Sequence, residues 1–262
     1  MDFFADWEAQ FVLWLPVFIR LSTFWITAPM LGQHVPALTK IGISGLLAVL
    51  VFPFIAPGAQ PETLPELGMQ VLAESITGLI YGFVVNMVFA AIYLSGQFID
   101  VPMGFGMVNI FDPQTDVQVP LMSQFHRILA VLLFFAINGH QAFFRALVES
   151  FALIPIGGVQ ITGGVVEGVV RIFASLFLLG LRIALPIMGA ILLTDVALGI
   201  ITRAVPQINV FIVGFPVKIA VGLFLYIFVL PVYVALISSI FSAGGEMVQM
   251  LRSLALRIGG AP

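Results

Sequence analysis

Ionisable side chains recur inside the most apolar stretches of this sequence. An isolated charge in lipid costs several kcal/mol, so charged residues within membrane segments are rare and usually face protein or a water-filled cavity. Two kinds of chemistry fit them: a relay that passes protons or ions, or a structural network of ion pairs between helices or subunits. The residues concerned are Arg20, Glu74, Arg145, Glu149, Arg171, Arg182, Asp195, Arg203 and Lys218.

The spacing of these charges favours the structural network. Glu74, Gly78 and Gly82 step by four residues, so they share one face of a helix, and the two glycines offer a surface of small residues to a partner helix. Arg145 and Glu149 are spaced in the same way. A relay usually needs carboxylates close together in the sequence or a paired histidine, and neither is evident. The relay remains the alternative interpretation.

The residue types typical of catalytic and metal sites do not occur at the required spacings. His34, His126 and His140 fit no metal-binding spacing, and a chain without cysteine has no thiolate ligand or nucleophile. We find no nucleophile elbow, no phosphate-cradling glycine loop, no paired catalytic carboxylates and no cofactor fingerprint. The sequence therefore predicts no catalytic residue, no metal and no cofactor, and a protein that is not an enzyme.

A polar stretch over residues 95–124 interrupts the apolar character most clearly. Its Gly104-Phe105-Gly106-Met107 segment joins two conformationally permissive glycines to two large, adaptable side chains. The Phe111-Asp112-Pro113 segment is typical of a turn. One interpretation is a loop packed against neighbouring helices. The other is a movable apolar obstruction inside a polar conduit, because hydrophobic constrictions can gate such conduits.

The composition requires that membrane helices position these residues. Hydrophobic residues make up 61% of the chain and charged residues only 9%, against roughly 25% charged residues in soluble domains. The net charge of −3 and the scattered Lys and Arg give no sign of nucleic-acid binding. Apolar runs predict helical segments near 10–31, 40–56, 68–99, 127–155, 171–203 and 208–241.

Several of these segments are longer than the about 20 residues that cross a hydrocarbon core of about 30 Å. Tilt, kinks at internal prolines, or helices standing partly outside the bilayer would each account for the excess. A weak internal repeat runs from Lys40 to Pro53 and again from Lys218 to Pro231. It suggests two related helical hairpins, although apolar helices can also match by chance.

The predicted fold is therefore all-α: a multi-pass membrane protein of long kinked helices and helical hairpins, in a single membrane domain over residues 1–262. Its parts are an N-terminal hairpin at about 10–56, central long helices at about 68–155 with a loop at about 100–124, a C-terminal hairpin at about 171–241, and an amphipathic helix at about 244–258.

Short distinctive motifs are spread over nearly the whole chain. In the first part they are Phe18-Ile19-Arg20, Pro29-Met30-Leu31-Gly32, Pro36-Ala37-Leu38-Thr39-Lys40, Gln97-Phe98-Ile99-Asp100, Gly104-Phe105, Phe111-Asp112-Pro113 and Asn138-Gly139-His140. In the second they are Leu185-Pro186, Asp195-Val196-Ala197-Leu198-Gly199, Val205-Pro206-Gln207-Ile208-Asn209-Val210-Phe211, Gly214-Phe215-Pro216-Val217-Lys218 and Pro231. Together they resemble the flagellar branch of the FliR/SpaR/SctT family, the R-type subunits of the bacterial type III protein export gate.

This resemblance implies a function that composition alone does not show. It implies a core subunit of a helical hetero-oligomeric export gate in the bacterial inner membrane, within the flagellar basal body. The implied partners are P-type, Q-type and B-type gate subunits, the exported flagellar proteins and membrane lipid, with no nucleic acid. The gate forms the channel entry through which unfolded flagellar proteins leave the cytoplasm, and long helices with buried charges would face other subunits.

The family's plug, a loop that obstructs the lumen, maps onto the polar stretch. The resemblance implies that Phe105, Met107 and Phe111 form an apolar stopper, with Asp112 and Pro113 setting its shape. The predicted plug residues are Gly104, Phe105, Gly106, Met107, Phe111, Asp112 and Pro113.

A secondary transporter with broken helices is the alternative function. Intramembrane charges and prolines in the middle of apolar segments are also features of such transporters. A defined complex with different small membrane proteins would favour the export gate, whereas a stable monomer or homodimer that binds a substrate would favour the transporter.

Overall fold

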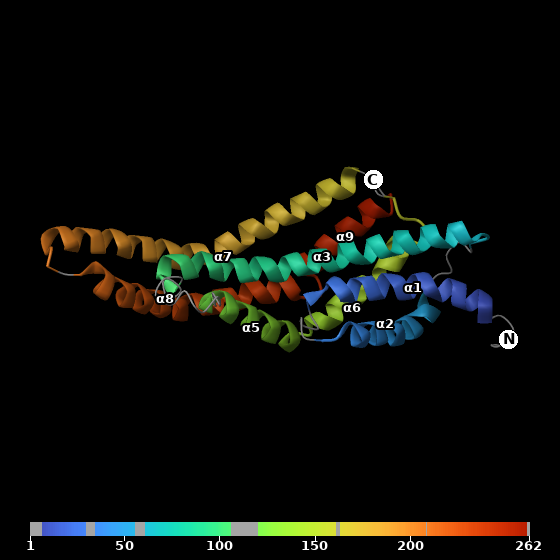
Figure 1. Cartoon of the computed structure of the whole chain (residues 1–262), viewed down its shortest axis with the longest axis horizontal. Helices are drawn as coiled ribbons and strands as arrows, with labels where there is room; N and C mark the ends of the chain where they lie inside the picture. The colour runs from blue at the N-terminus through green and yellow to red at the C-terminus, as the bar shows by residue number, and fades with distance from the viewer. Residues whose placement is uncertain are drawn as a thin grey trace. The chain divides into compact units, whose positions relative to one another are not determined.

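The computed structural model describes residues 7–29, 35–55, 61–105, 120–160, 163–207 and 209–260, and every regular element within them is a helix. Five helices are long and apolar enough to cross a membrane, or up to six spans if the bent pair α5 and α6 counts as one. This confirms the predicted all-α, multi-pass class (Figure 1). The elements are α1 (Trp7–Thr27), α2 (Ala37–Val51), the short 3-10 helix η2 (Phe52–Phe54), α3 (Leu64–Met103), α5 (Leu121–Ala136), α6 (Gly139–Leu153), α7 (Gly163–Ala204), α8 (Val210–Phe241) and α9 (Glu246–Ile258).

Two helices are much longer than a bilayer requires. Helix α3 has 40 residues and α7 has 42, which correspond to about 60 Å at 1.5 Å per residue. Helix α3 extends beyond the predicted segment 68–99 at both ends. Pro65 lies in its first turn, where the missing N–H has no intrahelical partner to lose, and Pro102 lies in its last turn.

The predicted segment at 127–155 is two helices rather than one. Helix α5 ends at Ala136 and α6 begins at Gly139, and the two helices are bent at this break. Asn138 between them has a φ of 57°, the left-handed conformation that asparagine tolerates better than most residues. The Asn138-Gly139 pair is a turn signal in its own right, and it could have been used to predict the break.

The chain divides into two compact units. Unit 1 contains Met1–Val88, Asn138–Phe173 and Phe241–Pro262, and unit 2 contains Phe89–Ile137 and Ala174–Ile240. Unit 1 therefore holds α1, α2, α6, α9 and the first parts of α3 and α7. Unit 2 holds α5, the remainder of α3 and most of α7 and α8.

In unit 1, α1 packs between α2 on one side and the glycine face of α3 on another. Helices α1 and α2 lie side by side (Figure 1). A Cβ atom on Gly78 would collide with the main-chain oxygen of Arg20, and one on Gly82 would collide with Thr27. The small-residue surface predicted on α3 therefore contacts α1, and only glycine permits the approach.

Helix α9 completes the core of unit 1 with its apolar face. Met247, Leu251 and Leu254 are buried, whereas Arg252 is exposed. The Tyr81 hydroxyl of α3 donates a hydrogen bond of 3.2 Å to the main-chain oxygen of Leu251. The amphipathic helix predicted at 244–258 thus covers the chain's own core with its apolar side.

In unit 2, glycines also allow α3 to pack closely against α5 and α7. A Cβ atom on Gly96 would meet the backbone of Ser123 in α5, and one on Gly180 would meet the main-chain oxygen of Ala91. The apolar core beside these approaches consists of Ile99, Met103, Ala184, Ile187, Ile191 and Tyr226.

Candidate functional site

The buried centre of unit 1 is an ion pair between Arg20 of α1 and Glu74 of α3, whose side chains are both 0% exposed. The Arg20 Nε donates to Glu74, its Nη1 donates to the Ser150 hydroxyl at 3.2 Å, and its Nη2 donates to the main-chain oxygen of Ile154 at 2.9 Å. The Arg20 guanidinium carbon also lies 4.1 Å from the centre of the Phe151 ring. All three guanidinium nitrogens therefore have acceptors.

The partners of Glu74 point to a structural role for the pair. The second Glu74 carboxylate oxygen accepts a hydrogen bond of 3.3 Å from the backbone N–H of Gly157. Arginine stays protonated under all ordinary conditions, so it makes a poor member of a proton relay. Removing one member of such a pair would leave the other charge buried without compensation. The cluster thus fixes α1, α3, α6 and the segment after α6 within unit 1.

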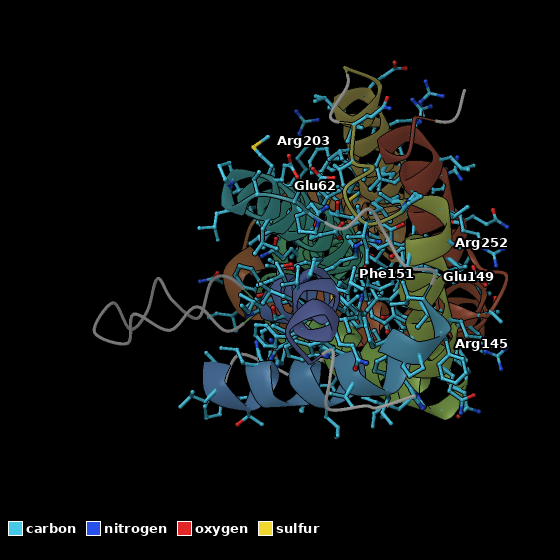
Figure 2. The ribbon with its side chains drawn as sticks, turned by 90° about the vertical axis from the view of Figure 1, so that its right-hand side faces the viewer. Glu62, Arg145, Glu149, Phe151, Arg203 and Arg252 are labelled. Carbon is cyan, nitrogen blue, oxygen red and sulfur yellow. The ribbon has the colours of Figure 1, made fainter. Side chains whose placement is uncertain are left out.

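A second ion pair in unit 1 lies at the surface. Arg252 of α9 donates two hydrogen bonds, of 2.9 and 3.0 Å, to the carboxylate of Glu149 on α6. Figure 2 shows these two side chains together, with Arg145 on the same helix, α6. Arg171 pairs with Glu167 one turn away on α7, and both are exposed. Exposed pairs of this kind contribute about 0.2–1 kcal/mol.

In unit 2, an ion pair lies beside the start of the predicted plug. Lys218 of α8 pairs with Asp195 of α7, and their side chains are 18% and 38% exposed. The Lys218 Nζ lies 5.7 Å from the centre of the Phe215 ring. That ring covers Gly104, so that a Cβ atom on Gly104 would overlap it. Lys218, one of the charges predicted as structural, therefore lies over the ring that covers the first glycine of the predicted plug.

Of the predicted plug residues, the structure describes Gly104 and Phe105. Gly104 follows the last turn of α3 with a φ of 87°, which favours glycine. Phe105 is partly buried and packs against the core of unit 2. The other predicted plug residues lie outside the described residues: Gly106, Met107, Phe111, Asp112 and Pro113.

Asp100 forms hydrogen bonds that the sequence analysis did not predict. It is 4% exposed, and one carboxylate oxygen accepts the Met122 N–H at 2.8 Å. The other accepts the Ser123 N–H at 3.1 Å and the Ser123 hydroxyl at 2.9 Å. These bonds join α3 to the start of α5. No local pattern marks a bond that spans 22 residues, so Asp100 entered the sequence analysis only as part of a family motif.

A buried polar group lies next to this junction. The Ser95 hydroxyl is 2.7 Å from the Nδ1 of His126, and the Tyr233 hydroxyl donates at 3.0 Å to the main-chain oxygen of His126. The ring centres of His126 and Tyr233 are 4.6 Å apart. These contacts link α3, α5 and α8 through their buried faces.

The charged residues predicted as one buried network form separate groups in the structure. Among them only Arg20 and Glu74 are completely buried within the chain. Arg145, Arg182 and Arg203 are exposed, and none forms a salt bridge with a carboxylate that the structure describes. Sequence spacing identified the charged faces of the helices, but it could not tell which faces meet inside the chain.

The helices and the site together define a multi-pass helical membrane protein with close glycine-mediated helix packing and charges on both buried and exposed faces. The family model of bacterial export proteins, family 1, matches residues 11–244, and the chain belongs to this family. The resemblance drawn from the motifs is thereby confirmed.

Individual relatives match about nine tenths of the chain. It is 34% identical to the flagellar biosynthetic protein FliR of Bacillus subtilis (strain 168) over 248 residues. This alignment covers 93% of this chain and 96% of the relative. It is 30% identical over 244 residues to FliR of Aquifex aeolicus (strain VF5), with 92% and 93% covered. The match to FliR of Escherichia coli (strain K12) is 29% over 242 residues, with 89% and 91% covered. The chain is a flagellar export protein of the FliR family.

Proposed function

We propose that this chain is a non-enzymatic core subunit of the flagellar type III protein export gate. In this role it forms, with P-type, Q-type and B-type subunits, the channel entry through which unfolded flagellar proteins leave the cytoplasm. The gate lies in the bacterial inner membrane within the flagellar basal body. Support comes from the family membership and from relatives over almost the whole chain that carry the name of a flagellar biosynthetic protein.

The observation that carries the proposal is the position of Arg182. This arginine lies near the middle of the 42-residue α7 and is exposed. Leu178 and Leu185, one turn away on either side, are 50% and 47% exposed. An arginine at the centre of a helix in lipid costs about 2.5–3.5 kcal/mol on insertion scales. A protein surface or a water-filled conduit beside α7 removes that cost, and a multi-subunit channel supplies both.

The length of the helices supports the same role. Helices α3 and α7, at about 60 Å each, exceed a hydrocarbon core of about 30 Å twofold. Large exposed apolar side chains also extend over more than one bilayer thickness. Along α7 and the residue that follows it, they run from Val166 to Val205. Neighbouring subunits rather than lipid are the proposed cover for much of this surface.

The segment that begins at Gly104 is the proposed plug of the channel. Phe105 packs against the core of unit 2, so Met107 and Phe111 are the residues proposed to obstruct the lumen. Asp112 and Pro113 are proposed to shape the turn behind them. The buried Arg20–Glu74 pair is proposed to be structural, since all three guanidinium nitrogens and both carboxylate oxygens have hydrogen-bond partners.

Purification in mild detergent tests the proposed function. The tagged chain should co-purify with several different small membrane proteins in a fixed ratio, whereas an unrelated tagged membrane protein should not. A stable monomer or homodimer that binds a small solute would overturn the proposal and favour a transporter.

A further inference from the structure

The start of α5 lacks the local cap that a helix normally has. The first backbone N–H groups of a helix have no intrahelical partner, and Ser, Thr, Asp or Asn at the N-cap usually satisfies one of them. Here the N-cap residue is Pro120, which forms no side-chain hydrogen bond. The N–H groups of Met122 and Ser123 are taken instead by Asp100, which lies in the last turn of α3.

The backbone of α3 is shaped to allow this contact. Gly96 and Asp100 are four residues apart and therefore share one face of α3. Gly96 lets the α3 backbone lie directly against the backbone of Ser123, where any Cβ atom would collide. Asp100, one turn further on, then reaches the open end of α5 with both carboxylate oxygens. A negative charge at a helix N-terminus is favoured in addition by the helix dipole.

The residues that directly follow α3 are also held by side-chain contacts. After Met103 the chain turns at Gly104 under the ring of Phe215, and the partly buried Phe105 packs against the core of unit 2. The centre of the Phe215 ring lies 5.7 Å from the Nζ of Lys218, which pairs with Asp195. The residues on both sides of segment 106–119 are therefore held by side chains of the same unit.

We propose that Asp100 is a positioning residue, which ties the end of α3 to the start of α5 and so fixes the points where segment 106–119 leaves and rejoins the helices. Loss of the Asp100 bonds would release the first turn of α5 from the end of α3. The connection to channel obstruction rests on the proposed function of this segment.

A graded set of variants separates the individual bonds. Asp100→Ala removes the three bonds, Asp100→Asn keeps one acceptor oxygen for the two N–H groups, and Ser123→Ala removes only the hydroxyl bond. The expected order of effect is therefore Asp100→Ala, then Asp100→Asn, then Ser123→Ala. The two milder variants keep the test meaningful if Asp100→Ala assembles poorly.

The direct readout is the distance between the ends of the segment. The chain contains no cysteine, so Val101→Cys and Leu121→Cys, at positions 77% and 49% exposed, can carry two spin labels in the assembled complex. With Asp100 present, pulsed electron paramagnetic resonance should give one narrow distance distribution, which broadens in the order given above. An equally narrow distribution in Asp100→Ala and Asp100→Asn would overturn the proposal.

The second readout is the leak of small ions through membranes that contain the complex. Asp100→Ala should raise the leak severalfold at unchanged subunit composition, and a variant lacking Gly104 to Met107 serves as the reference for an open channel. If the distances broaden in Asp100→Ala but neither this variant nor the one lacking Gly104 to Met107 leaks, the role of Asp100 is supported and the proposed plug is contradicted. A leak with unchanged distances would contradict the role of Asp100 and leave the plug supported.

Discussion

In unit 1, Arg20 and Glu74 are completely buried and every guanidinium nitrogen has an acceptor within the chain. In unit 2, Lys218 and Asp195 remain 18% and 38% exposed, and Arg182 lies on an exposed face of α7. The sequence alone gives these charges the same appearance, because each is an ionisable residue within an apolar helix. Their surroundings differ, and we propose that the first pair stabilises the fold and that the exposed charges of unit 2 meet partners outside the chain.

The glycines of α3 show the same contrast within one helix. Gly78 lies against the backbone of α1, so an added methyl group has no room there, whereas Gly68 has nothing within 4 Å of the position of its Cβ atom. Gly78 is therefore required for helix packing, and Gly68 only lowers the helical propensity of its turn.

The largest effect is expected from Arg20→Ala. This change leaves Glu74 buried and unpaired, which destabilises a protein by about 3–5 kcal/mol. The amount of protease-resistant chain in membranes should fall sharply. The double variant Arg20→Ala, Glu74→Ala should lose less than the sum of the two single variants, because it leaves no lone buried charge. Wild-type protease resistance in Arg20→Ala would show that the pair does not stabilise unit 1.

A smaller effect is expected from Gly78→Ala. The methyl group would push α1 away from α3 at the main-chain oxygen of Arg20, and overpacking of this kind costs about 1–3 kcal/mol. The matched control is Gly68→Ala in the same helix, which should leave stability unchanged or raise it by about 0.5–1 kcal/mol. Thermal unfolding of the purified complex compares them, and equal midpoints would contradict the packing role of Gly78.

The smallest effect on the chain itself is expected from Arg182→Ala. An exposed residue without a described ion-pair partner should change the stability of the chain by less than about 0.5 kcal/mol. The yield of the complex should nevertheless fall, because a partner's acceptor would be left unpaired. Arg171→Ala is the control, since Arg171 pairs within α7 with Glu167. Loss of export at full complex yield would favour the relay interpretation instead.

Some of this arrangement could be predicted from residue spacing. The four-residue steps from Glu74 to Gly82 predicted one packing face of α3, because the helix period places such residues on one side. The same spacing could not identify α1 as the partner, since Arg20 lies 54 residues away. The apolar runs likewise predicted the long helices and the all-α class, with ends that differed by several residues.

The contacts that were missed depend on tertiary structure. Asp100 caps a helix that starts 21 residues later, a relation with no local sequence pattern. The exposure of Arg182 and the burial of Arg20 depend on which helix faces meet, and propensity or periodicity does not give this. The break at Asn138 differs from these cases, because the sequence contains a turn signal there. The long apolar run around it nevertheless led to the prediction of a single helical segment.

Cross-linking beside Arg182 in intact membranes tests most directly whether the exposed face of α7 is a subunit interface. A photoreactive amino acid at Leu185, one turn from Arg182 and 47% exposed, is compared with the same group at Ile187, which is 1% exposed. The account predicts a product between Leu185 and a different small membrane protein of the export gate, and no such product from Ile187. Adducts of position 185 with lipid alone would contradict it.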